Sequence, residues 1–143
     1  GAGPRKDKKF INKIYRQIAA GKTELAVVDD KLGTPTYTVD FAHGLRTLLE
    51  SDLYGTYNQV CPGSCSRYDV AVRLVEHLGL AGKVQVNKVS SDHFKEEYFA
   101  VRPASEKLVN MKLSARNLLV MRDWEVCLAE YAQVFAADLA QRA

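Results

Sequence analysis

The chain has 143 residues, of which 47% are hydrophobic and 26% are charged, and its formal net charge is +3. This composition is that of an ordinary globular protein, so we expect one domain over residues 1–143, as part of a larger protein. The weak positive charge argues against a nucleic-acid-binding module, and no apolar run approaches the roughly 18 residues that span a membrane.

The first predicted element is an amphipathic helix over residues 8–20, which Gly21 ends. Its apolar face consists of Phe10, Ile11, Ile14 and Ile18. The preceding segment, Gly1 to Pro4, is not a dinucleotide-binding fingerprint, because no strand precedes it and Pro4 stands where the phosphate loop would continue.

A strand, a rigid turn and a helix follow. Residues 25–28 form an apolar run of strand length, and two aspartates end it. Gly33 and Pro35 predict a turn, in which Pro35 favours an extended Thr34. Thr38 is the expected N-cap of a helix reaching about residue 51. One face of that helix carries Phe41, Leu45, Leu48 and Leu49. From the residues alone, this stretch also fits an ordinary surface turn.

The middle of the chain repeats the alternation of strand and helix. Residues 55–60 are predicted as a second strand, which Pro62 and Gly63 end. Ser66 to Asp69 resembles a capping box with aspartate in place of glutamate, and it introduces a helix that Gly79 closes. Residues 84–89 alternate in polarity, which predicts a strand with one solvated face.

The last third is predicted to end in a long helix. Residues 90–102 indicate a short helix and then an extended segment, and residues 105–113 indicate a loop that runs into another short helix. Asp123 is the expected N-cap of the final helix. Its apolar stripe, interpreted as core, consists of Trp124, Cys127, Leu128, Tyr131 and Phe135.

Cysteine and histidine usage argues against metal and disulfide sites. The three cysteines are an odd number in a chain with a normal core, which favours reduced thiols and a cytoplasmic protein. The pair Cys61 and Cys65 has one residue too many for a redox C-x-x-C motif. The three histidines are dispersed, without zinc-ligand spacing, and we expect no metal.

Three segments resemble one enzyme family, and they occur in its order. VVDDKLGTPTYTVDFA, RPASEKLVNMKL and MRDWEVCLAEY resemble patterns in the C-terminal half of the dTDP-4-dehydrorhamnose reductases, which are extended short-chain dehydrogenases that act on nucleotide sugars. The resemblance covers essentially the whole chain. It implies an α/β fold, with about four main helices and a few short strands, that lacks the N-terminal Rossmann half. Residues 1–4 resemble the glycine-rich segment that follows a strand of the family's cofactor-binding sheet, so the chain is expected to begin in the middle of its parent protein.

The resemblance implies hydride transfer from NADPH or NADH to the C4 ketone of a dTDP-sugar. Such dehydrogenases need a glycine-rich turn for the cofactor and a Tyr-x-x-x-Lys pair, whose lysine lowers the pKa of the tyrosine. In this chain no tyrosine has a lysine four residues later, and the nearest case is Tyr98 followed by Arg102. We therefore expect no catalytic residue, no cofactor site and no hydride transfer in this chain alone.

The remaining residues would shape the sugar-nucleotide pocket. Arg102 is the first candidate, because a guanidinium binds phosphate oxygens in a bidentate way and the family's Arg-Pro lies near the substrate's phosphates. Its alternative is a solvated arginine before a turn. Thr36 and Tyr37 match the family's substrate-side loop, although Tyr37 also suits a packing role. Lys9 and Asn12 are weaker candidates, for which ordinary helix-surface residues are the favoured interpretation.

Two functions follow from these expectations. The first is the substrate-binding C-terminal portion of a nucleotide-sugar reductase in dTDP-rhamnose biosynthesis, whose partners would be a dTDP-sugar and the missing cofactor-binding half. The second is a non-catalytic partner or regulatory protein on the same fold, as the regulatory subunit of methionine adenosyltransferase resembles these reductases. Without its other half, the chain would expose a sheet edge and an apolar patch, so we expect a homodimer or a swapped assembly.

Overall fold

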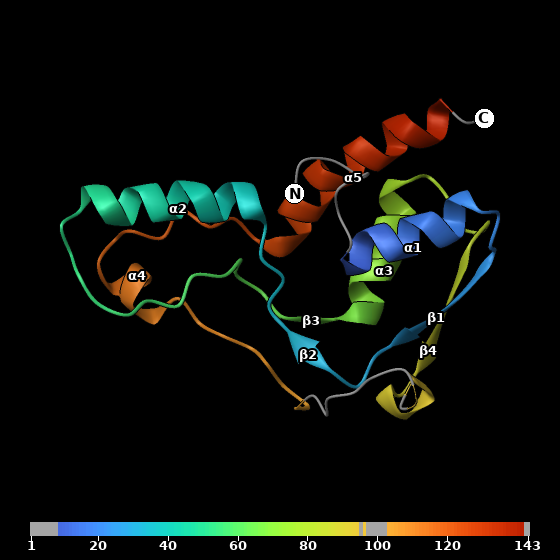
Figure 1. The fold of residues 1–143 in the computed structure, drawn as a ribbon, viewed down its shortest axis with the longest axis horizontal. Coiled ribbons are helices and arrows are strands. Elements are labelled where there is room, and N and C mark those ends of the chain that lie inside the picture. The colour runs from blue at the N-terminus through green and yellow to red at the C-terminus, as the bar shows by residue number, and fades with distance from the viewer. Residues whose placement is uncertain (1–8, 95, 97–102, 142–143) are drawn as a thin grey trace.

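The computed structural model describes residues 9–94, 96 and 103–141, and its mixed α/β architecture agrees with the expected fold class (Figure 1). The four longer helices are α1 (Phe10–Ala19), α2 (Thr38–Glu50), α3 (Arg67–His77) and α5 (Trp124–Ala140). Shorter elements are β1 (Glu24–Val28), β2 (Leu32–Gly33), β3 (Cys65–Ser66), β4 (Gln85–Val89), the 3-10 helix η1 (Ser91–Phe94) and α4 (Met111–Ala115). Within these ranges, no helix is long and apolar enough to cross a bilayer.

A two-stranded parallel sheet lies among the helices α1, α3 and α5. β1 pairs with β4 so that Glu24 lies opposite Gln85 and Val28 opposite Val89. The long connection between them contains α3, which packs against both strands and against α5, while α1 packs against α3. Leu25, Leu74 and Phe135 are among the most completely buried side chains. The core therefore lies where the apolar faces predicted for these segments meet.

The helix caps agree with two of the three predictions. Ser66 and Asp69 form a complete capping box before α3, since each side chain accepts a hydrogen bond from the other residue's backbone N–H. Asp123 caps α5, and its carboxylate accepts from the backbone N–H of Glu125. The prediction for Thr38 was wrong by one residue, because Thr38 is already helical and the extended Tyr37 is the N-cap.

The predicted strand over residues 55–60 is wrong, because no strand forms there. A strand needs a neighbouring backbone, and here side chains take that place. The carboxamide of Asn110 accepts from the N–H of Val60 at 2.9 Å and donates to its carbonyl at 2.8 Å. Lys112 Nζ donates to the carbonyl of Thr56 at 2.9 Å. These hydrogen bonds hold the segment against the start of α4, and no strand pairing is involved.

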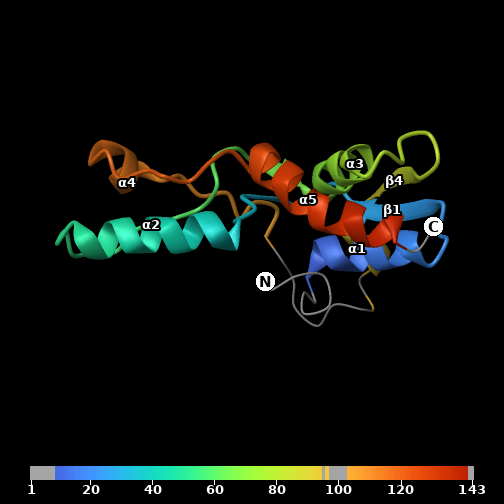
Figure 2. The same ribbon diagram turned by 90° about the horizontal axis from the view of Figure 1, so that it is seen from above.

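Helix α2 extends away from the helices that surround the β1–β4 sheet (Figure 2). Its buried residues are Asp40 and Gly44, and the side chain of Gln59 lies against Gly44 so closely that a Cβ there would be 2.4 Å from Gln59 Nε2. The opposite side carries Phe41, Leu45 and Leu49, which are 41%, 47% and 72% exposed. The predicted apolar face of this helix is therefore not part of the core of the described chain.

Three predictions fall on or next to the gaps in the described ranges. The 3-10 helix Ser91–Phe94 agrees with the short helix expected after residue 90. The extended segment that was expected to lead to Arg102, and the segment Gly1 to Pro4, lie outside the described residues.

Candidate functional site

Two aspartates end β1, and both serve the local structure. Asp29 accepts hydrogen bonds from Lys88 Nζ and from the hydroxyl of Ser66, each at 2.9 Å. Asp30 accepts from the backbone N–H of Ser91 at 3.0 Å and from its hydroxyl at 2.9 Å. These contacts lower the pKa of both carboxyl groups, through Lys88 for Asp29 and through the Ser91 N–H for Asp30. The two carboxylates therefore hold the end of β1 against β4, β3 and the start of η1.

A small framework of β2, β3 and the chain after Pro103 follows β1 and presents the loop that contains Thr36. β2 pairs antiparallel with β3, with Leu32 opposite Ser66. On its other side, the N–H of Leu32 donates to the carbonyl of Ala104 at 3.0 Å, and its carbonyl accepts from Glu106 at 2.8 Å. This brings the chain that follows Pro103 alongside β2. Two of the three motif segments are thus neighbours, although about 70 residues separate them in the sequence.

The candidates Thr36 and Tyr37 lie on the loop between β2 and α2. Thr36 is exposed, and its hydroxyl lies 3.5 Å from the carbonyl of Thr34. Tyr37 is half-buried, and its hydroxyl donates to Glu130 Oε1 at 3.0 Å. Burial, followed by the hydrogen bond to Glu130, raises the pKa of the Tyr37 phenol. Tyr37 therefore anchors the loop to α5, while Thr36 presents its side chain to solvent.

The candidates on the first helix differ in exposure. Lys9 is the exposed N-cap of α1, and its carbonyl accepts from the N–H of Lys13 at 3.1 Å. Asn12 is only 2% exposed, so the favoured interpretation of this side chain as a helix-surface residue was wrong. Arg102 lies outside the described residues. The four described candidates thus come from two elements, α1 and the loop before α2.

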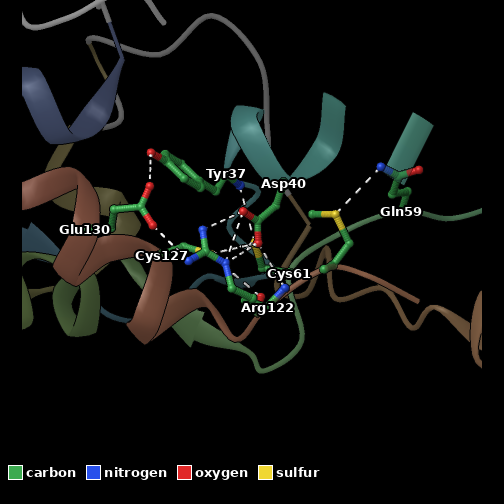
Figure 3. Close-up of polar contacts among 8 residues, drawn as sticks. Tyr37, Asp40, Gln59, Cys61, Arg122, Cys127 and Glu130 are labelled. Carbon is green, nitrogen blue, oxygen red and sulfur yellow. Dashed lines mark hydrogen bonds and ion pairs between the residues drawn. The ribbon is translucent and has the colours of Figure 1, made fainter. Parts of the chain in front are cut away.

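The sequence analysis missed a ring of polar contacts, which we call the Arg122 ring (Figure 3). It consists of Tyr37, Asp40, Cys61, Arg122, Cys127 and Glu130. Arg122 Nη2 and Nε donate to the carboxylate of Asp40 at 2.6 and 2.9 Å, and Nη1 donates to Glu130 Oε2 at 2.8 Å. Its backbone N–H also donates to Asp40, at 3.0 Å. Asp40 and Arg122 each lie inside one of the motifs quoted above. Their charge within a motif was the sequence feature from which a role could have been predicted.

Electrostatics in the Arg122 ring keep its carboxylates ionised. Asp40 is 3% exposed, and the hydrogen bonds from Arg122 outweigh its burial and lower its pKa to about 2. The hydrogen bonds to Asp40 and Glu130 raise the pKa of Arg122. The hydrogen bonds from Arg122 and Tyr37 lower the pKa of Glu130. The ring therefore contains one guanidinium between two carboxylates, and the pair with Asp40 joins the first turn of α2 to the segment before α5.

Two thiols, those of Cys61 and Cys127, complete the ring. The N–H of Tyr37 lies 3.3 Å from Cys61 Sγ, and Cys61 Sγ lies 3.8 Å from Cys127 Sγ. Burial raises the pKa of Cys127 to about 12, and burial also raises that of Cys65 to about 12. All three cysteines are buried, and none of them forms a disulfide bond within the described residues.

In the ranges 9–94 and 103–141, no three side chains of the metal-ligating types gather around a common point. An open hollow between the first turns of α3 and α5 contains none of the candidates, and the basic side chain that lines it, Arg73, already pairs with Glu76 and Glu125. The exposed hydroxyl of Thr36 and the exposed side chain of Lys9 can donate hydrogen bonds to a polar ligand.

The comparisons with known proteins agree with the pattern of motifs. The model of the RmlD substrate binding domain matches residues 4–137. The spore coat polysaccharide biosynthesis protein SpsK of Bacillus subtilis is 32% identical over 124 residues, which cover 87% of this chain and 41% of that protein. The dTDP-4-dehydrorhamnose reductase of Mycobacterium tuberculosis is 32% identical over 117 residues, which cover 81% of this chain and 38% of that enzyme.

Solved structures give the same picture. The dTDP-4-dehydrorhamnose reductase of Yersinia enterocolitica superposes with a TM-score of 0.84 at 31% identity, over 94% of this chain and 46% of that one. The reductase of Bacillus anthracis, solved in complex with NADP, superposes with a TM-score of 0.76 at 30% identity, over 87% of this chain and 42% of that one. The chain thus spans about two fifths of the length of the curated relatives it matches.

Proposed function

The chain belongs to the RmlD substrate-binding domain family, and from this premise we propose that it forms the sugar-nucleotide-binding side of a dTDP-4-dehydrorhamnose reductase-like enzyme. The observation that carries the proposal is the family match over residues 4–137, which includes the loop of Thr36 and the segment of Arg102. The small framework of β2, β3 and the chain after Pro103 supports it, because this framework presents the loop to solvent.

The proposed ligand contacts follow the chemistry of a nucleoside diphosphate sugar. Arg102 would bind the diphosphate, since a guanidinium donates two parallel hydrogen bonds to phosphate oxygens. Thr36 would donate its exposed hydroxyl, and Tyr37 would border the pocket from the same loop. Lys9 would contribute from the start of α1, whereas Asn12 is buried there and is not proposed as a ligand contact. These groups bind and orient a ligand, and none of them is assigned a step in the reaction.

Hydride transfer is assigned to the parent enzyme and not to this chain alone. We propose that the parent uses NADPH or NADH, held by the portion of the enzyme that this chain does not span. The relative from Bacillus anthracis was solved in complex with NADP, which favours this cofactor class. When bound, a nicotinamide cofactor supplies the hydride, and the role of this chain is to hold the sugar nucleotide beside it.

The first prediction concerns ligand binding. Titration of the purified chain with dTDP and with dTDP-rhamnose is expected to give saturable binding by calorimetry, and NADPH is expected to give none. Arg102→Ala should weaken dTDP binding at least about tenfold, because one charge-assisted contact with the diphosphate is lost. Arg73→Ala is the matched control, since Arg73 is an exposed arginine paired with Glu76. No response to any probe, or equal affinities in both variants, would contradict the proposal.

The exposed apolar side of α2 suggests that this helix packs against the missing half. Phe41, Leu45 and Leu49 recur at four-residue spacing, and a helix with such a stripe normally buries it. Exposed apolar stripes of this kind mark interaction surfaces. We propose that the cofactor-binding half covers this stripe in the parent enzyme, and that a second copy of the chain covers it when that half is absent.

The second prediction concerns self-association through α2. Sedimentation velocity at tens of micromolar should show a dimer or larger assembly for the wild-type chain. Leu45→Glu should give monomers, because a charge in the middle of the apolar stripe would have to be buried in the assembly. Val126→Glu, at an exposed valine on α5, should sediment as the wild type does. A wild-type chain that is only monomeric would count against the proposal.

A further inference from the structure

The Arg122 ring closes on itself and holds Tyr37 from two sides (Figure 3). The phenol donates to Glu130 Oε1 at 3.0 Å, and the backbone N–H of the same residue lies 3.3 Å from Cys61 Sγ. The Tyr37 ring also lies beside Tyr131, at a centroid distance of 6.1 Å. Tyr37 is thereby fixed through its side chain and its backbone at once.

The charged members of the ring are hydrogen-bonded to one another, and Arg122 keeps two N–H groups that these bonds do not use. Arg122 Nε and Nη2 donate to Asp40, and Nη1 donates to Glu130. Both carboxylate oxygens of Glu130 accept hydrogen bonds, one from Tyr37 and the other from Arg122. These contacts hold Tyr37 and the first turn of α2, and any effect on a ligand through them is indirect.

Glu130 connects two anchors of the same loop. One anchor is the phenol of Tyr37 at the end of the loop. The other is the Asp40–Arg122 pair, which fixes the first turn of α2 directly after it. Thr36 precedes Tyr37 in the chain, so its position depends on the backbone that these anchors hold.

We propose that Glu130, together with Arg122, is a positioning residue that sets the conformation of the Thr36–Tyr37 loop. The proposal rests on the proposed function in one respect, because it assigns to this loop the contact with the sugar nucleotide. The consequence for a ligand is indirect. Loss of Glu130 loosens the loop and weakens binding without removing any group that touches the ligand.

The test compares loop exchange and ligand affinity in Glu130→Ala. Amide hydrogen exchange measured by NMR at residues 36–38 should quicken about tenfold in this variant, while the amides of α3 exchange as in the wild type. The Kd for dTDP should rise about fivefold. Because Glu130 is half-exposed on a helix and alanine favours helices, the variant should melt close to the wild-type temperature. Glu130→Gln, which keeps one acceptor, should restore part of both effects.

Glu125→Ala is the matched control on the same helix. Its carboxylate lies 3.8 Å from Arg73, away from the Arg122 ring, so it should leave exchange at residues 36–38 unchanged. The proposal is overturned if Glu130→Ala leaves that exchange within about twofold of wild type, or if exchange quickens and the Kd for dTDP stays the same. A wild-type chain that binds no dTDP overturns the proposed function, and the exchange comparison, which needs no ligand, still decides whether Glu130 positions the loop.

Discussion

Replacement of Arg122 by alanine is expected to lower the free energy of unfolding by about 3 kcal/mol at neutral pH. Asp40 is buried, and the substitution removes the guanidinium that donates to both of its oxygens. The backbone N–H of residue 122 and the thiol of Cys127 still reach Asp40. Because these partners remain and the Arg122 side chain is itself 43% exposed, we expect no more than the lower end of the range observed when one partner of a buried ion pair is removed.

The pH dependence of this effect follows from the pKa of Asp40. In the wild type that pKa is about 2, below the ordinary value of 3.8. Asp40 therefore stabilises the fold above about pH 4, by about 2 kcal/mol, and this contribution is lost as the pH falls toward 2. In the variant, burial without the guanidinium should raise the pKa of Asp40 above its ordinary value. The difference between the two proteins should hence be small near pH 2 and full near pH 7.

Urea unfolding at both pH values measures this prediction. Arg46→Ala is the matched control, because Arg46 forms an exposed ion pair with Glu50 within one helix. Such pairs contribute at most a few tenths of a kcal/mol, and the control should be nearly neutral at both pH values. Equal losses in the two variants at neutral pH, or a loss in Arg122→Ala that does not change with pH, would contradict the role of the ion pair.

Replacement of Gly63 by alanine is expected to cost about 3 kcal/mol of stability, for two reasons that add. Gly63 has a φ of +86°, a conformation that costs an L-residue about 1 kcal/mol. A Cβ at this position would lie 2.6 Å from Cδ1 of the buried Trp124 ring and 3.0 Å from a carboxylate oxygen of Asp123. Neither group yields easily, since Trp124 is part of the core and Asp123 caps α5.

Gly82→Ala separates the two causes. Gly82 has a similar φ of +81°, but nothing lies within 4 Å of a Cβ built there. Its substitution should therefore cost only the backbone term of about 1 kcal/mol. Both variants are compared by urea unfolding at neutral pH. If Gly63→Ala were no less stable than Gly82→Ala, the close packing of Gly63 against Trp124 would not be a determinant of stability.

Local patterns predicted most of the elements, because each depends on neighbouring residues. In the capping box before α3, the side chains of Ser66 and Asp69 accept hydrogen bonds from each other's backbone N–H, so four residues are enough to predict where the helix begins. The stripe of α5 has the helical period, and Trp124, Cys127 and Phe135 are indeed buried. The strand expected over residues 55–60 depended on a partner instead. Its composition suited a strand, but Asn110, 50 residues away, supplies the hydrogen bonds.

The candidate site was predicted in part. Its loop could be located from the motif that contains Thr36 and Tyr37, and both lie on the surface segment before α2. The partners of that loop could not be predicted. Arg122 reaches Asp40 across 82 residues, and Tyr37 reaches Glu130 across 93. No periodicity or spacing rule relates residues so far apart, because the path of the chain between them decides their distance.

The sequence by itself determined the longer helices, two of the three predicted caps and the β1 and β4 strands, since propensity, capping and apolar period act over a few residues. It also determined the family, through three motifs in order. Only the tertiary structure decided that β2 joins the chain after Pro103, that the Arg122 ring forms, and that α2 turns its apolar stripe outward. Each of these depends on contacts between distant segments, and packing of the whole chain selects which of the compatible contacts are made.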